Sequence, residues 1–172
     1  MDLTALRPWL TLVHVLAAFG FFAVHGVSMA VMFQVRGQRD PDRIRALLDL
    51  SSSTIGAMYL FLLVLLLAGI LSGIAGAWWT SGRLWIWAAV GLLFVVIVAM
   101  YAVMTRYYIA LRAAVGPASP ANTGEAAVVA QSAALSAPEL EVMLGSSRPL
   151  VGAAIGIVGM IVIVWLMTAK PF

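Results

Sequence analysis

The stretch WLTLVHVLAAFGFFAVHGVSMAVMF, residues 9–33, contains no Asp, Glu, Lys or Arg. About 20 apolar residues in a helix are enough to cross the hydrocarbon core of a bilayer, so this stretch can span a membrane. Three further stretches of spanning length also lack charged residues, at 54–79, 84–105 and 150–168. We therefore expect an all-α integral membrane four-helix bundle, formed by residues 1–172 as a single transmembrane domain.

The composition supports this class. Of the 172 residues, 63% are hydrophobic and 10% are charged, whereas soluble domains have about 25% charged residues. The chain contains no cysteine, which excludes disulfides, thiolate metal ligands and thiol nucleophiles. Its net charge of +3 is spread along the chain without a dense basic run, so we expect no binding to nucleic acid.

The arginines predict how the chain crosses the membrane. The segments 34–53 and 106–149 together contain seven arginines, and the other side of the membrane would hold Arg7, Arg83 and Lys170. Since cytoplasmic loops carry an excess of Lys and Arg, we expect both segments in the cytoplasm and both termini outside.

Short amphipathic helices are expected within these cytoplasmic loops. Asp40 followed by Pro41 has the pattern of an N-cap and a first helical residue. Ser136 and Glu139 have the spacing of a capping box. An alanine-rich helix that begins at Thr123 is expected between them. The long loop 106–149 is therefore predicted to be partly ordered.

Glycines and a short turn predict how the spans pack. The turn at 80–83 is so short that the second and third spans are expected to be antiparallel neighbours. Gly69 with Gly73, and Gly152 with Gly156, form pairs of small residues four positions apart. Such pairs allow helices to approach closely.

The histidines His14 and His25 are the only two in the chain. Eleven residues are close to three helical turns, so both rings are expected on one face of the first span, about 16 Å apart along its axis. This face should point into the bundle, because polar groups are costly in lipid. We also expect Tyr59 and Tyr101 at a depth where they could share a hydrogen-bond network with His25.

A conventional enzyme centre is not expected. The spans contain no carboxylate and no cysteine, and the chain has no third histidine. Zinc sites, di-iron sites and Ser-His-Asp triads therefore lack the residues that they need. We predict no catalytic residues and do not expect the chain to be an enzyme by itself.

Two cofactors fit the histidine stripe. In one interpretation His14 and His25 are axial ligands of haem b, and Met160 is the second ligand opposite His25. In the other, His25, Met29 and Met32 stand at i, i+4 and i+7 and form a soft metal site for Cu(I). A third interpretation needs no cofactor, since methionines at helical spacing are common in cores and a buried histidine is often satisfied by a hydroxyl or a carbonyl.

The segment His14-Val15-Leu16-Ala17-Ala18, the turn Arg36-Gly37-Gln38-Arg39-Asp40-Pro41 and the glycine-rich second span carry a family resemblance. The first 110 residues or so resemble small bacterial four-span integral membrane proteins of unknown function, which are loosely similar to copper-resistance-D-type proteins. The resemblance implies a multi-pass protein of the bacterial inner (plasma) membrane, with His14 as the matched histidine. It implies copper handling through the more distant relatives.

Three functions from different classes are consistent with the sequence. We expect first a non-catalytic accessory or structural subunit of a larger membrane complex of respiratory or photosynthetic type, with the lipid bilayer and other membrane subunits as partners. The alternatives are a haem b-binding subunit for electron transport and a copper-binding or copper-transport membrane protein.

Overall fold

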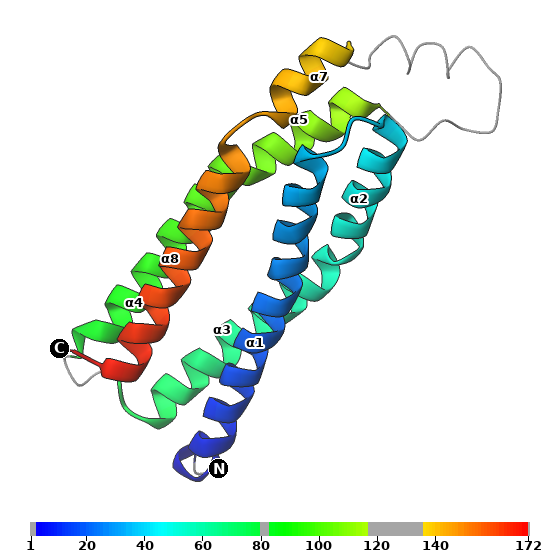
Figure 1. The fold of residues 1–172 in the computed structure, drawn as a ribbon. Coiled ribbons are helices and arrows are strands. Elements are labelled where there is room, and N and C mark those ends of the chain that lie inside the picture. Colours follow the sequence, from blue (N-terminus) through cyan, green and yellow to red (C-terminus); the bar gives the residue numbers. More distant parts are fainter. Residues whose placement is uncertain (1–2, 80–82, 117–135, 172) are drawn as a thin grey trace.

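The computed structural model describes residues 3–79, 83–116 and 136–171, and these residues form helices and turns without any strand (Figure 1). Four helical stretches are long and apolar enough to cross a membrane: Thr4–Arg36, Pro41–Ala75, Leu84–Val115 and Ala137–Ala169. The prediction of an all-helical protein with four long apolar helices is confirmed. The chain is a multi-pass membrane protein.

Each of these stretches, apart from the first, is divided into shorter segments. Thr54 separates α2 from α3, and a short π-helical turn, η1, joins α4 to α5. In chain order the described segments are α1 (Leu3–Arg36), α2 (Pro41–Ser53), α3 (Ile55–Ala75), α4 (Leu84–Met100), η1 (Tyr101–Thr105), α5 (Arg106–Val115), α7 (Ala137–Leu144) and α8 (Arg148–Ala169).

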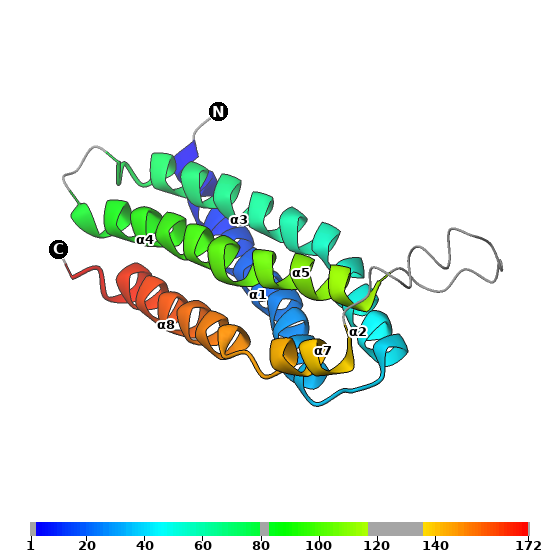
Figure 2. The same ribbon diagram turned by 90° about the horizontal axis from the view of Figure 1, so that it is seen from above.

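The long helices associate as two pairs. α1 packs mainly against α3, and α4 packs mainly against α8, while α1 also contacts α8 (Figure 1, Figure 2). Both chain termini lie at the same end of the bundle, which we call the terminal end. The opposite end, where α2, α5 and α7 gather, is called the core end. The two pairs are thus joined most extensively at the core end.

A compact apolar core forms at the core end. Ile44 and Leu48 of α2 and Leu111 of α5 are fully buried there, at 0% exposure. Because this core takes side chains from four different segments, it joins the α1–α3 pair to the continuation of α4. Its buried members are Val31, Met32, Val35, Ile44, Leu48, Tyr107, Leu111, Ala114, Val115, Leu140 and Leu144.

Helices α2 and α7 form at the two positions where the sequence predicts short helices, and local capping explains both. The Asp40 carboxylate accepts a hydrogen bond from the Asp42 backbone N–H at 3.0 Å. At the start of α7, the Ser136 backbone N–H donates to the Glu139 carboxylate at 3.0 Å, within a capping box. The expected helix that begins at Thr123 lies outside the described residues.

Arg45 ties α2 to the end of α5. Its Nε and Nη2 donate to the Val115 carbonyl at 3.1 and 2.9 Å, and Nε also donates to the Gly116 carbonyl at 3.2 Å. The same guanidinium pairs with Asp42. A cation at a helix C-terminus satisfies free carbonyls and interacts favourably with the helix dipole.

The second and third spans are antiparallel, but each packs mainly on a different helix. α3 ends at Ala75, and the turn that follows brings tryptophan rings between the spans. The Trp79 indole N–H donates to the Ile70 carbonyl at 3.3 Å, and the Trp79 ring makes a T-shaped contact with Trp87 at 5.1 Å. The two spans are thus antiparallel as expected, but they are not packed on each other as the short turn predicts, because α3 packs on α1 and α4 packs on α8.

The glycine pairs pack against large side chains rather than against a second glycine-rich helix. A Cβ added at Gly69 would lie 2.8 Å from His14 Nδ1, and one added at Gly73 would overlap the Trp79 ring. Gly152 gives room to the side chain of Met104 in the same way. The small residues therefore allow close packing, as expected, but of large side chains against bare backbone.

Candidate functional site

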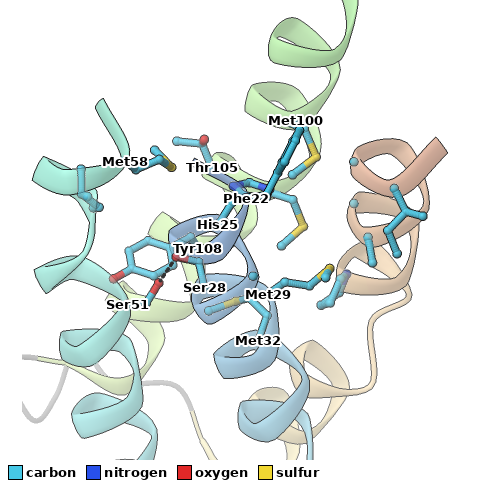
Figure 3. A pocket seen from close by; sticks show the side chains of 18 of the residues that line it. Phe22, His25, Ser28, Met29, Met32, Ser51, Met58, Met100, Thr105 and Tyr108 are labelled. Atoms are coloured by element: carbon cyan, nitrogen blue, oxygen red, sulfur yellow. Dashed lines mark hydrogen bonds between the residues drawn. The ribbon is translucent and has the colours of Figure 1, made fainter. Parts of the chain in front are cut away.

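A cavity of about 310 Å³ lies between the two helix pairs (Figure 3). Its walls come from α1, α2, α3, α4, η1, α5 and α8. The cavity extends along α1 from Phe22 to Met32, from just beyond the middle of this helix to the edge of the apolar core. It is therefore a space within the bundle rather than a groove on one helix.

Methionines dominate the walls of the cavity. Six of the nine methionines in the chain line it. Met58 and Met100 lie on different sides of His25 from Met29 and Met32 (Figure 3). Long thioether side chains adapt to irregular spaces, and their sulfur atoms are soft metal ligands. The six are Met29, Met32, Met58, Met100, Met104 and Met160.

His25 lines the same cavity and is only partly exposed. Its ring stacks on Phe21 with a centroid distance of 5.6 Å and an interplanar angle of 11°. A Cβ on Gly156 of α8 would lie 4.0 Å from His25 Nε2, so the ring reaches across toward α8. Nδ1 is buried without a hydrogen-bond partner among the described residues. An unpaired buried polar group costs about 1–3 kcal/mol.

His14 lies in a different environment. Its Nδ1 donates to the Leu65 carbonyl oxygen at 2.8 Å, and its ring covers Gly69 on α3. His14 does not line the cavity. The face of α1 that carries both histidines is therefore covered by α3 near His14 and borders the cavity near His25.

Hydroxyl groups on one wall of the cavity satisfy one another. Ser51 Oγ donates to Ser28 Oγ at 3.2 Å (Figure 3). The Tyr108 hydroxyl donates to the Leu48 carbonyl at 2.8 Å and lies 2.6 Å from Ser52 Oγ. Among the described residues that line the cavity, His25 is the one with a buried side-chain nitrogen or oxygen that has no hydrogen-bond partner.

The network expected around His25 differs from the one in the structure. Tyr59 borders the cavity but is 61% exposed, while Tyr101 is 64% exposed and outside the lining. Tyr101 begins the π-helical turn, whose wider winding shifts the register of the residues that follow. Thr105 and Tyr108 face the cavity instead. The π-helical turn that produces this shift has no recognisable signal in the sequence.

The donor atoms of the cavity restrict which metal it could hold. Across residues 3–79, 83–116 and 136–171, no group of three or more His, Cys, Asp or Glu side chains could bind a metal ion. One imidazole and several thioethers suit Cu(I), which prefers soft ligands. The imidazole of His25 and the thioethers around the cavity thus fit Cu(I) better than zinc or magnesium.

These features define a helical multi-pass membrane protein with a methionine-lined cavity between two helix pairs. Comparison of the chain with known protein families, curated proteins and solved structures finds no match. Any assignment of function therefore rests on the residues of this chain. The predicted ligands His25, Met29, Met32 and Met160 lie around one cavity, whereas His14 is packed against α3.

Proposed function

We propose that the protein binds Cu(I) in the cavity between the helix pairs, with the His25 imidazole and methionine thioethers as ligands. One observation carries this proposal: His25, whose buried Nδ1 has no hydrogen-bond partner among the described residues, lines a cavity that contains six of the nine methionines of the chain. Imidazole and thioether groups are ligands that Cu(I) accepts.

The methionines divide into two groups around His25. Met29 and Met32 follow it on α1 by four and seven residues, which keeps them on the same side of that helix. The others, including Met104 of η1 and Met160 of α8, belong to helices on the other walls. Ligands from both groups would connect the two helix pairs through the metal.

Replacing Met29 and Met32 together with leucine is expected to weaken Cu(I) binding at least about tenfold. Leucine has nearly the volume of methionine, so the packing is retained while the sulfur ligands are removed. The measurement is a titration of the purified protein in detergent micelles with Cu(I), under reducing conditions, against a colorimetric Cu(I) chelator. We expect one Cu(I) for each wild-type chain.

Met167→Leu is the matched control, because Met167 lies on α8 but does not line the cavity. It should bind Cu(I) like the wild type. The proposal would be contradicted if leucine at all six cavity methionines left the affinity unchanged. The same titration of leucine variants at the methionines of the other walls, starting with Met104→Leu and Met160→Leu, identifies the remaining ligands.

Haem b is the second candidate. The observation that favours it is that His25 on α1 and Met160 on α8 border the same cavity, as an axial pair would require. Against it, the volume of about 310 Å³ is at the lower end of the range for ligand pockets, about 300–1,000 Å³. A tetrapyrrole would have to separate the helix pairs. A Soret band at full occupancy in the protein purified from its native membrane, lost in Met160→Leu, would favour haem over copper.

An accessory role in a larger membrane complex is still a prediction. The many exposed apolar side chains along α3, α4 and α8 are what lipid contact requires. They do not distinguish lipid from a neighbouring subunit. Purification from native membranes tests this role directly, because a stable partner would copurify in a fixed ratio with the chain.

The core end is proposed to face the cytoplasm, with both termini outside and the protein in a bacterial inner membrane. The seven arginines of the segments 34–53 and 106–149 support this orientation. Because the chain has no cysteine, a single introduced cysteine can report the orientation without background labelling. Ala46→Cys in α2 and Ala169→Cys at the end of α8 both lie at exposed positions.

We expect an impermeant maleimide added to intact cells to label Ala169→Cys and not Ala46→Cys. After the membrane is disrupted, both variants should react. The opposite pattern in intact cells would reverse the orientation and place the termini in the cytoplasm.

A further inference from the structure

Three arginines at the core end have no ion-pair or side-chain hydrogen-bond partner among the described residues: Arg106 at the start of α5, and Arg36 and Arg148, which lie on neighbouring helices. Arg36 is the last residue of α1 and Arg148 is the first residue of α8. Neither guanidinium forms an ion pair or a hydrogen bond with any residue that the structure describes. Other arginines at this end do pair, namely Arg39 with Glu141, Arg43 with Asp40, Arg45 with Asp42 and Arg112 with Asp49.

Arg36 and Arg148 lie at similar depths on neighbouring helices. Gly156 of α8 and His25 of α1 are adjacent across the cavity. From that level α1 continues eleven residues to Arg36, and α8 runs back eight residues to Arg148. At 1.5 Å per residue, these distances are about 16 and 12 Å along the two helices.

The apolar core connects the two positions. Val35, one residue before Arg36, and Leu144, four residues before Arg148, belong to the same buried cluster as Tyr107. The Tyr107 hydroxyl donates to the Met143 carbonyl at 3.3 Å, which fixes Tyr107 between α5 and α7. Arg36 and Arg148 therefore both lie at the edge of this core, where the ends of α1 and α8 approach α5.

The first turn of α8 adds to the positive potential. It contains no acidic residue, and Ser147 at the N-cap position makes no side-chain capping bond. The positive end of the helix dipole is thus not offset by a carboxylate in that turn. An anion beside Arg148 would interact favourably with both the guanidinium and the dipole.

Apolar side chains extend from these arginines along the bundle surface. Phe33, one turn before Arg36, is 40% exposed, and Leu150 and Val151, just after Arg148, are 50% and 45% exposed. The positively charged guanidinium groups thus lie at the ends of two spans, next to an apolar surface. A molecule that combines an anionic group with hydrocarbon chains matches both features.

We infer that Arg36 and Arg148 bind the phosphodiester of an anionic phospholipid headgroup, with its acyl chains along Phe33, Leu150 and Val151. Basic sites between transmembrane helices at the cytoplasmic side are suited to anionic headgroups. The apolar surface favours a lipid over free phosphate, which has no hydrocarbon to place there. This inference does not depend on metal binding in the cavity.

The double variant Arg36→Gln with Arg148→Gln is expected to bind phosphatidylglycerol about thirtyfold more weakly than the wild type, since each arginine near an anionic surface contributes about 1 kcal/mol. The full chain, purified in detergent, is titrated with phosphatidylglycerol, and the lipid retained is counted by native mass spectrometry. Phosphatidylcholine, which carries no net charge, should bind the wild type much more weakly.

The matched control is Arg39→Gln with Arg43→Gln, which removes the same charge from arginines that already have carboxylate partners. It should retain phosphatidylglycerol. Arg36→Lys with Arg148→Lys should restore much of the binding and shows that the positions tolerate substitution. Equal binding of the two lipids, or equal binding by the glutamine variant and the wild type, would overturn the inference. Displacement of the lipid by an equal concentration of inorganic phosphate would also overturn it, in favour of a free-anion site.

Discussion

His25→Ala is expected to weaken Cu(I) binding at least about a hundredfold, because loss of even a supporting contact to a metal ligand costs about 10–100-fold in affinity. The variant removes the imidazole that lines the cavity, and the thioethers would then be the main donors left there. The substitution also removes a buried nitrogen without a partner, so folding should not suffer from a new unpaired group. The measurement is the chelator-competition titration of the purified variant beside the wild type.

His14→Ala is the control for this prediction. It deletes the other imidazole of the chain, but at a position that donates to the Leu65 carbonyl and lies outside the cavity. This variant should be less stable than the wild type and should keep its Cu(I) affinity. If His14→Ala abolished binding and His25→Ala did not, the metal would have to lie between α1 and α3, and the proposed site would be wrong.

Those features of the fold that depend on composition alone were predictable from the sequence. A stretch such as 9–33 without a charged residue has few alternatives to a membrane helix, because every backbone polar group must be paired within the lipid. The caps at Asp40 and Ser136 were also predictable, since each depends on residues within one turn. Both are local signals that tertiary packing does not reverse.

Features that depend on contacts between helices were not predictable. The spacing of His14 and His25 placed them on one face of α1, but it could not show that α3 covers one ring and a cavity borders the other. The methionines at 58, 100 and 104 were missed for the same reason. They are distant in sequence from His25, and the π-helical turn that carries Met104 has no composition signal.

The cavity lies between two helix pairs that are held together at both ends of the bundle. The pairs are joined at the core end by the apolar core. At the terminal end, the Arg7 guanidinium and the Lys170 ammonium each lie over the Trp78 ring, 5.1 Å from its centroid. Cation–π contacts of this kind contribute about 0.5–2 kcal/mol. The pairs are thus held together at both ends, and the adaptable methionines line the space between.

Leu111→Ala is expected to lower the free energy of unfolding by about 2–5 kcal/mol, the range for a buried leucine replaced by alanine. Leu111 is fully buried at 0% exposure, within the core that connects α1, α2, α5 and α7. Its loss leaves a void where the two helix pairs are joined, and rigid packing elsewhere limits how far the void can close. Equilibrium unfolding in mixed detergent micelles, followed by circular dichroism, measures the change.

Ile109→Ala is the matched control, two residues away on the same helix. Ile109 is 61% exposed and lies outside the core, so the same kind of truncation should cost less than about 1 kcal/mol. An equal loss for both variants would mean that the core end does not hold the pairs together. The core end and the cavity are connected through α5, because Tyr107 in the core is adjacent in sequence to Tyr108 in the cavity wall. If Leu111→Ala also weakened Cu(I) binding severalfold while Ile109→Ala did not, the packing of the core end would be coupled to the geometry of the cavity.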